Sequence, residues 1–64
     1  MFELTITTDT DASSGVYETD AEVLAALEAA AEVDDLMVRL DSLRAGRFVD
    51  ADGVAWFSFS VRKA

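Results

Sequence analysis

Apolar and polar side chains alternate over the opening segment, with apolar residues at positions 2, 4 and 6. A period of two with several β-branched residues is typical of a strand that buries one face. The same period returns over residues 55–61, which place Phe57 and Phe59 on one face and Trp56 on the other. The pattern therefore predicts a strand at each end of the sequence, with the two phenylalanines pointing into the core.

The spacing changes to that of a helix over residues 20–32. Val23, Leu24 and Leu27 fall on one side together with Ala30 and Ala31, and alanine, the best helix former, fills much of the segment. Just before it, the side chains at 19 and 22 form a threonine–glutamate pair with the spacing of a capping box. The aspartates at 34 and 35 put the next apolar residues out of phase, so we expect one helix that stops near residue 32.

The segment 36–43 fits two patterns. Leu36, Val38 and Leu40 alternate as in a strand, whereas Leu36, Leu40 and Leu43 suit a second helix closed by Gly46. We favour the strand. Residues 47–49 and 54–63 then form a hairpin around the DADG turn.

That turn predicts positive φ angles at Asp52 and Gly53. The segment between the first strand and the helix, residues 9–20, is interpreted as a connection, because its aspartates, serines and Gly15 are common turn formers. The order of elements is then β-α-β-β-β, or β-α-α-β-β if residues 36–43 are helical. Both orders predict one α+β domain over residues 1–64 with a small antiparallel sheet of three or four strands, and the favoured order places one helix on one face of that sheet.

Residues 9–20 also have the length and the terminal acids of a calcium-binding loop. Such a loop has a glycine at its sixth position, a glutamate at its twelfth and a helix on each side. Here the sixth position is Ser14, the twelfth is Asp20, and the preceding element is a predicted strand. We therefore expect no calcium site in this segment.

Histidine and cysteine are both absent from the sequence. The commonest general base, the commonest metal ligand and the thiolates are thereby missing. The only lysine, Lys63, lies next to the last residue and no basic group is placed to activate a serine. Paired acids such as Asp34 with Asp35, or Asp50 with Asp52, are expected to be solvated turn residues. We predict a non-enzymatic protein without metal or cofactor.

The net charge of −8 is uneven along the chain, because residues 1–38 contain ten acids and no base, whereas residues 39–64 contain three acids and five bases. An acidic field repels nucleic acid and anionic membranes and attracts basic surfaces, although solubility alone also explains it. The N-terminus lacks the basic start of a signal peptide, and no apolar run reaches the roughly 18 residues of a membrane span. We expect a cytoplasmic protein without direct nucleic-acid or membrane binding.

Two surfaces are candidates for binding a protein. Trp56 and Arg62 share the strand face opposite Phe57 and Phe59, and both residue types are frequent at interface hot spots. This face could also pair two copies of the chain. The alternative is that Trp56 packs over a neighbouring strand as a second cluster in a monomer.

The second candidate surface is an acidic stripe. Glu28, Glu32 and Asp35 follow one another at intervals of four and three residues, and we expect them on the side of the helix away from Leu24 and Leu27. Regularly spaced carboxylates can imitate the phosphates of DNA and compete for a basic groove. A solvated helix face is the alternative.

The opening MFELTITTD, the AEV of the helix and a final GRFVDADG hairpin followed by an aromatic strand resemble a group of short, uncharacterised proteins of actinobacterial phages. The resemblance covers the two ends and the helix start. It implies a small phage protein that binds a host protein in the host cytoplasm. We therefore expect a protein–protein interaction module. An acidic DNA mimic that inhibits a nucleic-acid-binding protein is one alternative, and a structural homodimer without a separate partner is another.

Overall fold

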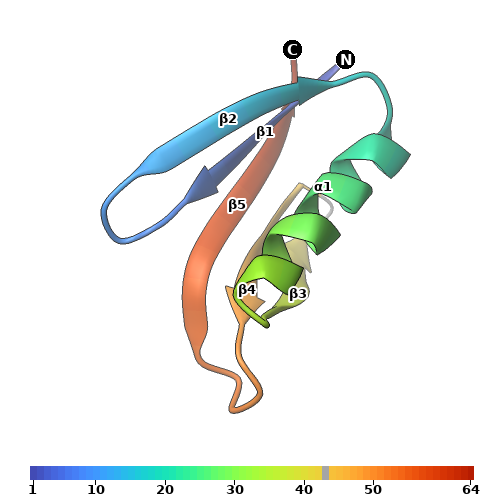
Figure 1. The fold of residues 1–64 in the computed structure, drawn as a ribbon. Coiled ribbons are helices and arrows are strands. Elements are labelled where there is room, and N and C mark those ends of the chain that lie inside the picture. Colours follow the sequence, from blue (N-terminus) through green and yellow to red (C-terminus); the bar gives the residue numbers. More distant parts are fainter. Residues whose placement is uncertain (43) are drawn as a thin grey trace.

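The computed structural model describes residues 1–42 and 44–64, and over these residues one helix packs on one face of a five-stranded antiparallel sheet (Figure 1). The helix α1 spans Asp20–Val33, and the strands are β1 (Phe2–Thr7), β2 (Ala12–Tyr17), β3 (Met37–Ser42), β4 (Ala45–Val49) and β5 (Ala55–Lys63). Their order in the sheet is β2-β1-β5-β4-β3. The α+β class is confirmed, but the prediction of three or four strands is wrong.

The additional strand is β2, which lies within the segment interpreted as a connection. All six of its residues pair with β1 in regular register, from Ala12 opposite Thr7 to Tyr17 opposite Phe2. The Thr8 N–H donates to the Asp11 carbonyl over 2.7 Å and closes the hairpin between the two strands. The order of elements is therefore β-β-α-β-β-β, and this first hairpin takes the place of the predicted loop.

The helix begins and ends close to where the sequence predicts. Thr19 is its N-cap, and the Thr19 hydroxyl accepts a 3.2 Å bond from the Glu22 N–H. At the other end Asp35 adopts a positive φ of 55°, which the helix cannot continue through. Three of the expected core residues of α1 are buried, namely Val23, Leu27 and Ala31. Leu24 was also expected in the core, but half of its surface is exposed.

The strand interpretation of the segment 36–43 is confirmed for Met37–Ser42, which forms β3 at one edge of the sheet. Leu43, on which the helical alternative depended, lies outside the described residues. The register between β3 and β4 shifts between Leu40 and Ser42, so this edge is irregular.

The core lies between α1 and the sheet, and Phe48 of β4 is its most buried residue. Its ring packs against that of Phe59 with centroids 5.4 Å apart. Gly46 allows this packing, because a Cβ there would lie 2.3 Å from the Arg39 carbonyl oxygen and 2.6 Å from the Phe59 ring. The opposite side of the sheet, which α1 does not cover, is called the uncovered face below.

The turn between β4 and β5 is built on Asp50. The Gly53 N–H donates to the Asp50 carbonyl, and the Asp50 N–H donates to the Val54 carbonyl, each over 3.0 Å. Gly53 has a φ of 82°, as predicted, but Asp52 does not have the positive φ that was predicted for it. Beyond the turn the register between β4 and β5 shifts, so that Trp56 is an extra residue in a bulge.

The two chain ends lie side by side, because β1 and β5 are neighbours in the middle of the sheet (Figure 1). Phe2 is opposite Lys63, and the Ala64 N–H donates to the Met1 carbonyl over 3.1 Å. Within the described residues, no helix combines the length and the apolar character needed to cross a membrane.

Candidate functional site

The five residues proposed for partner binding do not form one site. Trp56 and Arg62 belong to β5, whereas Glu28 and Glu32 belong to α1 on the other side of the sheet. Asp35 follows the end of the helix. The acidic stripe is therefore shorter than predicted, because only its two glutamates stand on the helix.

The placement of this stripe relative to Leu24 also differs from the prediction. Glu28 follows Leu24 by four residues within α1, so the two side chains are neighbours on the same side of the helix. The expectation that the stripe lies away from Leu24 is wrong. The exposed Leu24 and the acidic Glu28 instead lie next to each other. A partner on this side of α1 would therefore meet an apolar and a charged side chain together.

Trp56 remains 53% exposed at its bulge, as expected for a residue outside the core. Its indole Nε1–H donates to Oδ2 of Asp50 over 2.9 Å, which ties the ring to the preceding turn. With Thr7, Thr8 and Arg47 it lines a shallow hollow of about 300 Å³. Trp56 is therefore held in place but available for contact.

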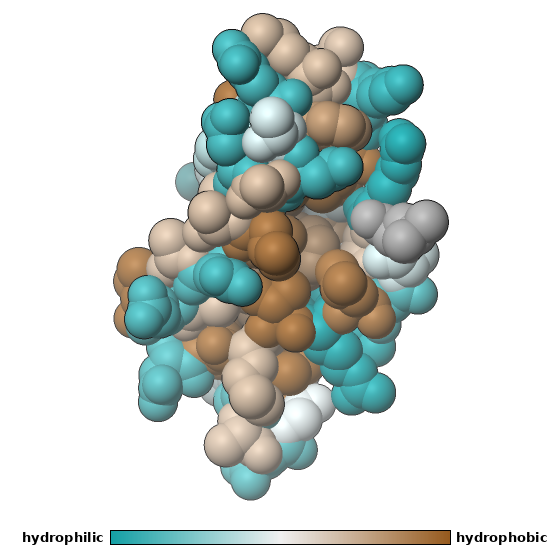
Figure 2. All heavy atoms as spheres, turned by 90° about the vertical axis from the view of Figure 1, so that its right-hand side faces the viewer, coloured by the Kyte–Doolittle hydropathy of each residue, from teal (hydrophilic) through white to brown (hydrophobic). Residues whose placement is uncertain are grey.

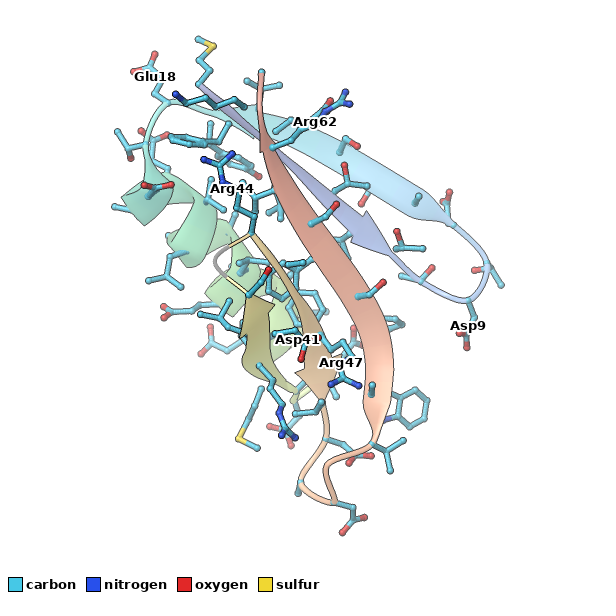
Figure 3. All side chains as sticks on the ribbon, turned by 180° about the vertical axis from the view of Figure 1, so that it is seen from behind. Asp9, Glu18, Asp41, Arg44, Arg47 and Arg62 are labelled. Carbon is cyan, nitrogen blue, oxygen red and sulfur yellow. The ribbon has the colours of Figure 1, made fainter. Side chains whose placement is uncertain are left out.

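Arg62, which Figure 3 labels, forms an ion pair with Glu3 of β1 on the uncovered face. Its charge is thereby balanced by a partner within the sheet. A second ion pair on this side joins Arg47 and Asp41 through two bonds of 3.0 Å. Paired guanidinium groups contribute little net positive field, so Arg62 is a weaker candidate for attracting an acidic partner than the sequence alone suggests.

Short side chains form the centre of the uncovered face. The register places Ser14, Thr5, Ser60 and Ala45 in one row across four strands. The hydroxyls of Thr5 and Ser14 lie 3.0 Å apart and bond to each other. This row is consequently polar and carries only short side chains.

Sequence reasoning missed an apolar groove beside α1. It has a volume of about 480 Å³ and lies between the helix and the strands β1, β3 and β5. Its apolar lining includes Phe2, Val23, Leu27, Phe59 and Val61. Leu24 and Leu40 also line it and are 50% and 62% exposed. On the side of the molecule where α1 lies, hydrophobic residues form a continuous patch in the middle (Figure 2).

The rim of this groove carries Asp20, Arg44 and Lys63. The Val61 N–H donates to the Arg44 carbonyl over 2.7 Å, which fixes Arg44 beside β5 (Figure 3). Among residues 1–42 and 44–64 the two ion pairs described above are the only ones, so neither Arg44 nor Lys63 has an ionic partner there. Two unpaired cations therefore stand at the mouth of an apolar groove in a chain whose net charge is −8.

The carboxylate of Asp50 is a poor candidate for acid–base chemistry. The indole bond from Trp56 and the backbone bonds from Val54, Asp52 and Gly53 hold the pKa of Asp50 below its usual value. A general acid at neutral pH needs the opposite shift. Asp50 instead stays ionised and organises the turn.

The described residues contain no group of three or more acidic side chains that could hold a metal ion. The segment considered as a calcium loop is extended over Ala12–Tyr17, which is unlike a loop that wraps around an ion. A comparison of the chain with family models, with curated proteins and with solved structures found no match.

Proposed function

We propose that this protein is a non-enzymatic binding module that holds an apolar segment of a partner protein in the groove beside α1. The groove itself is the observation that carries the proposal. It is of the usual size for a binding site, mostly apolar, and has a few polar groups at its mouth. Leu24 and Leu40 would lose much of their exposure to water when it is filled, which favours binding.

The charges at the rim indicate the chemistry of the partner. Arg44 and Lys63 favour a segment that carries a carboxylate beside its apolar side chains. The resemblance to phage proteins supports a host protein in the cytoplasm as the source of that segment. The chain's overall acidity would slow the approach of an acidic partner, so the interaction rests on apolar contact with local charge pairing.

The experiment is an affinity capture from an actinobacterial lysate with the tagged protein and with matched variants. Leu24→Ser and Leu40→Ser each remove an exposed leucine from the groove, and we expect each to weaken binding of the captured protein by roughly tenfold. Arg44→Gln should weaken it mainly at low salt. Arg39→Gln, a change of the same kind on the uncovered face, is the control and should bind like the wild type.

The other functions predict different results. If Trp56→Ala abolishes capture of a partner and Leu24→Ser does not, the binding site lies on the uncovered face. A nucleic-acid-binding partner that dissociates steeply with salt and depends on Glu28 and Glu32 would indicate DNA mimicry. A concentration-dependent molecular mass without any captured protein would indicate a structural homodimer and contradict the proposal.

A further inference from the structure

The two edge strands of the sheet differ in how they are protected against pairing with another strand. The edge strand β3 carries Arg39 and Asp41, and its register with β4 is broken between Leu40 and Ser42. Charges and bulges are the usual protection of exposed edges. The edge strand β2 has the sequence ASSGVY, without charge or proline, and its pairing with β1 is regular throughout.

The backbone groups on the free side of β2 follow from the register. The bond from the Thr8 N–H to the Asp11 carbonyl sets the alternation, so Ser13, Gly15 and Tyr17 bond to β1 and the residues between them point outward. The outward N–H of Ala12 already donates to Oδ1 of Asp11 over 2.8 Å. Ser14 and Val16 remain, and each offers an N–H and a C=O to an added strand.

Both sides of this edge are accessible to an incoming strand. On the side of α1, the Tyr17 ring lies close to Gly15, where its hydroxyl would be 3.1 Å from an added Cβ. On the uncovered face Val16 is 55% exposed, and Ser14 is exposed beside it. An added strand would therefore extend the sheet with an aromatic neighbour on one side and an aliphatic one on the other.

Acids stand at both ends of β2. Asp9 and Asp11 lie in the preceding hairpin loop, and Glu18 and Asp20 follow the strand. Figure 3 shows Asp9 and Glu18 at its opposite ends. A second copy of the chain paired at this edge would bring acids next to acids at both ends, in either strand orientation. Like charges side by side oppose such pairing, so a second copy is disfavoured.

We propose that β2 accepts an extended segment of a basic protein as a sixth strand of the sheet. The segment has about five uncharged residues opposite β2 and Lys or Arg at each end, where they meet the two pairs of acids. Main-chain bonds to Ser14 and Val16 hold the segment, and the flanking charges select it. Of the residues named here, this surface shares only Asp20 with the rim of the α1 groove, and it does not depend on the function proposed for that groove.

The test uses the peptide Lys-Lys-Thr-Val-Thr-Val-Thr-Lys-Lys and the 15N-labelled protein. We expect chemical-shift changes along β2 and hydrogen exchange at the amides of Ser14 and Val16 slowed by about tenfold or more at saturation. Binding should weaken as salt is added. The same peptide with Glu in place of Lys should not bind.

Two sets of variants locate the site. Val16→Pro removes an outward N–H without removing a bond to β1, and we expect it to abolish binding, whereas Val16→Ala keeps the N–H and should retain binding. Asp11→Asn with Glu18→Gln leaves the backbone intact and should weaken binding by roughly tenfold, which tests the proposal even if the proline variant fails to fold.

Three results would overturn the proposal. These are protection at β3 instead of β2, equal binding of the Lys and Glu peptides, and self-association of the protein through β2. The groove variant Leu24→Ser should bind the peptide normally, so a failure of the proposed function in the groove is distinguishable from a failure at this edge.

Discussion

At the scale of single residues, Asp50 organises the turn between β4 and β5 through one carboxylate. Its Oδ1 accepts bonds from the backbone N–H groups of Asp52 and Val54 over 2.9 and 3.0 Å, and its Oδ2 accepts the indole N–H of Trp56. All of these donors favour the ionised form, and the indole bond is the largest cause of the lowered pKa of Asp50. The turn and the orientation of Trp56 thus depend on the same negative charge.

The lowered pKa predicts how acid affects stability. Because the pKa of Asp50 is lower in the folded than in the unfolded chain, its contribution is fully present above the unfolded value of 3.8 and is lost as pH falls through the folded value. We expect the Tm of the wild type to fall more steeply than that of Asp50→Asn as the pH is lowered from about 5 to 2. Thermal unfolding followed by the fluorescence of Trp56 measures both.

Asp52→Asn is the matched control for this prediction, because Asp52 contributes its backbone N–H to the turn and its side chain forms no bond there. It should follow the wild type over the whole pH range. If Asp50→Asn also follows the wild type, the bonds to its carboxylate contribute nothing to the acid response.

At the scale of elements, α1 is the element that its own sequence specifies best. The alanine-rich segment, the N-cap Thr19 and the break at Asp35 all act locally, and together they set its bounds. The Thr19 hydroxyl accepts the Glu22 N–H and also donates to the Glu22 carboxylate over 3.5 Å. The start of the helix is therefore stabilised twice by a single side chain.

Removing this cap should destabilise the domain moderately. We expect Thr19→Ala to lower the free energy of unfolding by about 1 kcal/mol, because an N–H in the first turn loses its acceptor. Thr10→Ala, in the exposed tip of the first hairpin, is the control and should change little. Urea unfolding measures both, and equal midpoints for the two variants would contradict the role of the cap.

The elements also show why the sequence predicts some strands and misses another. β1 and β5 alternate clearly and are rich in β-branched or aromatic residues. β2 has serines and a glycine, which are typical of loops, and it is a strand because it pairs with β1 along its whole length and packs Tyr17 against the core. β2 is therefore a strand because of its tertiary contacts, which local propensity does not predict.

The α1 groove was missed for a related reason. Leu24 and Leu40 have the spacing of core residues in their own elements, and that part of the prediction follows from sequence alone. Their exposure depends on where one helix of 14 residues lies over a sheet of five strands. A single helix leaves part of such a sheet uncovered, and no local pattern indicates which part.

At the scale of the whole molecule, charge is divided between the two sides of the sheet. All four charged side chains of α1 are acidic, namely Asp20, Glu22, Glu28 and Glu32. The uncovered face carries Arg39, Arg47 and Arg62, two of which are paired with acids. Apart from Arg44 and Lys63 at the rim of the α1 groove, the basic side chains lie on the uncovered face, so partners that approach from opposite sides meet different fields.

The small size of the core limits what it tolerates. We expect Phe48→Ala to cost about 3–5 kcal/mol, because the ring is almost completely buried against Phe57 and Phe59. A domain of this length has only about that much stability in total, so the variant should be largely unfolded at 25 °C. Circular dichroism would show the loss, and Val33→Ala, at a position that is 83% exposed, should remain folded.

The adjacency of β1 and β5 has a consequence for how this chain reaches its fold. The central strand pair joins residues such as Glu3 and Arg62, which are 59 positions apart, so a long loop must close before the middle of the sheet exists. Proteins dominated by such distant pairs fold slowly. A circular permutant that joins residue 64 to residue 1 and opens within residues 50–53 would make this pair a local hairpin. We therefore expect this permutant to form the same sheet and to fold faster than the original chain in stopped-flow refolding.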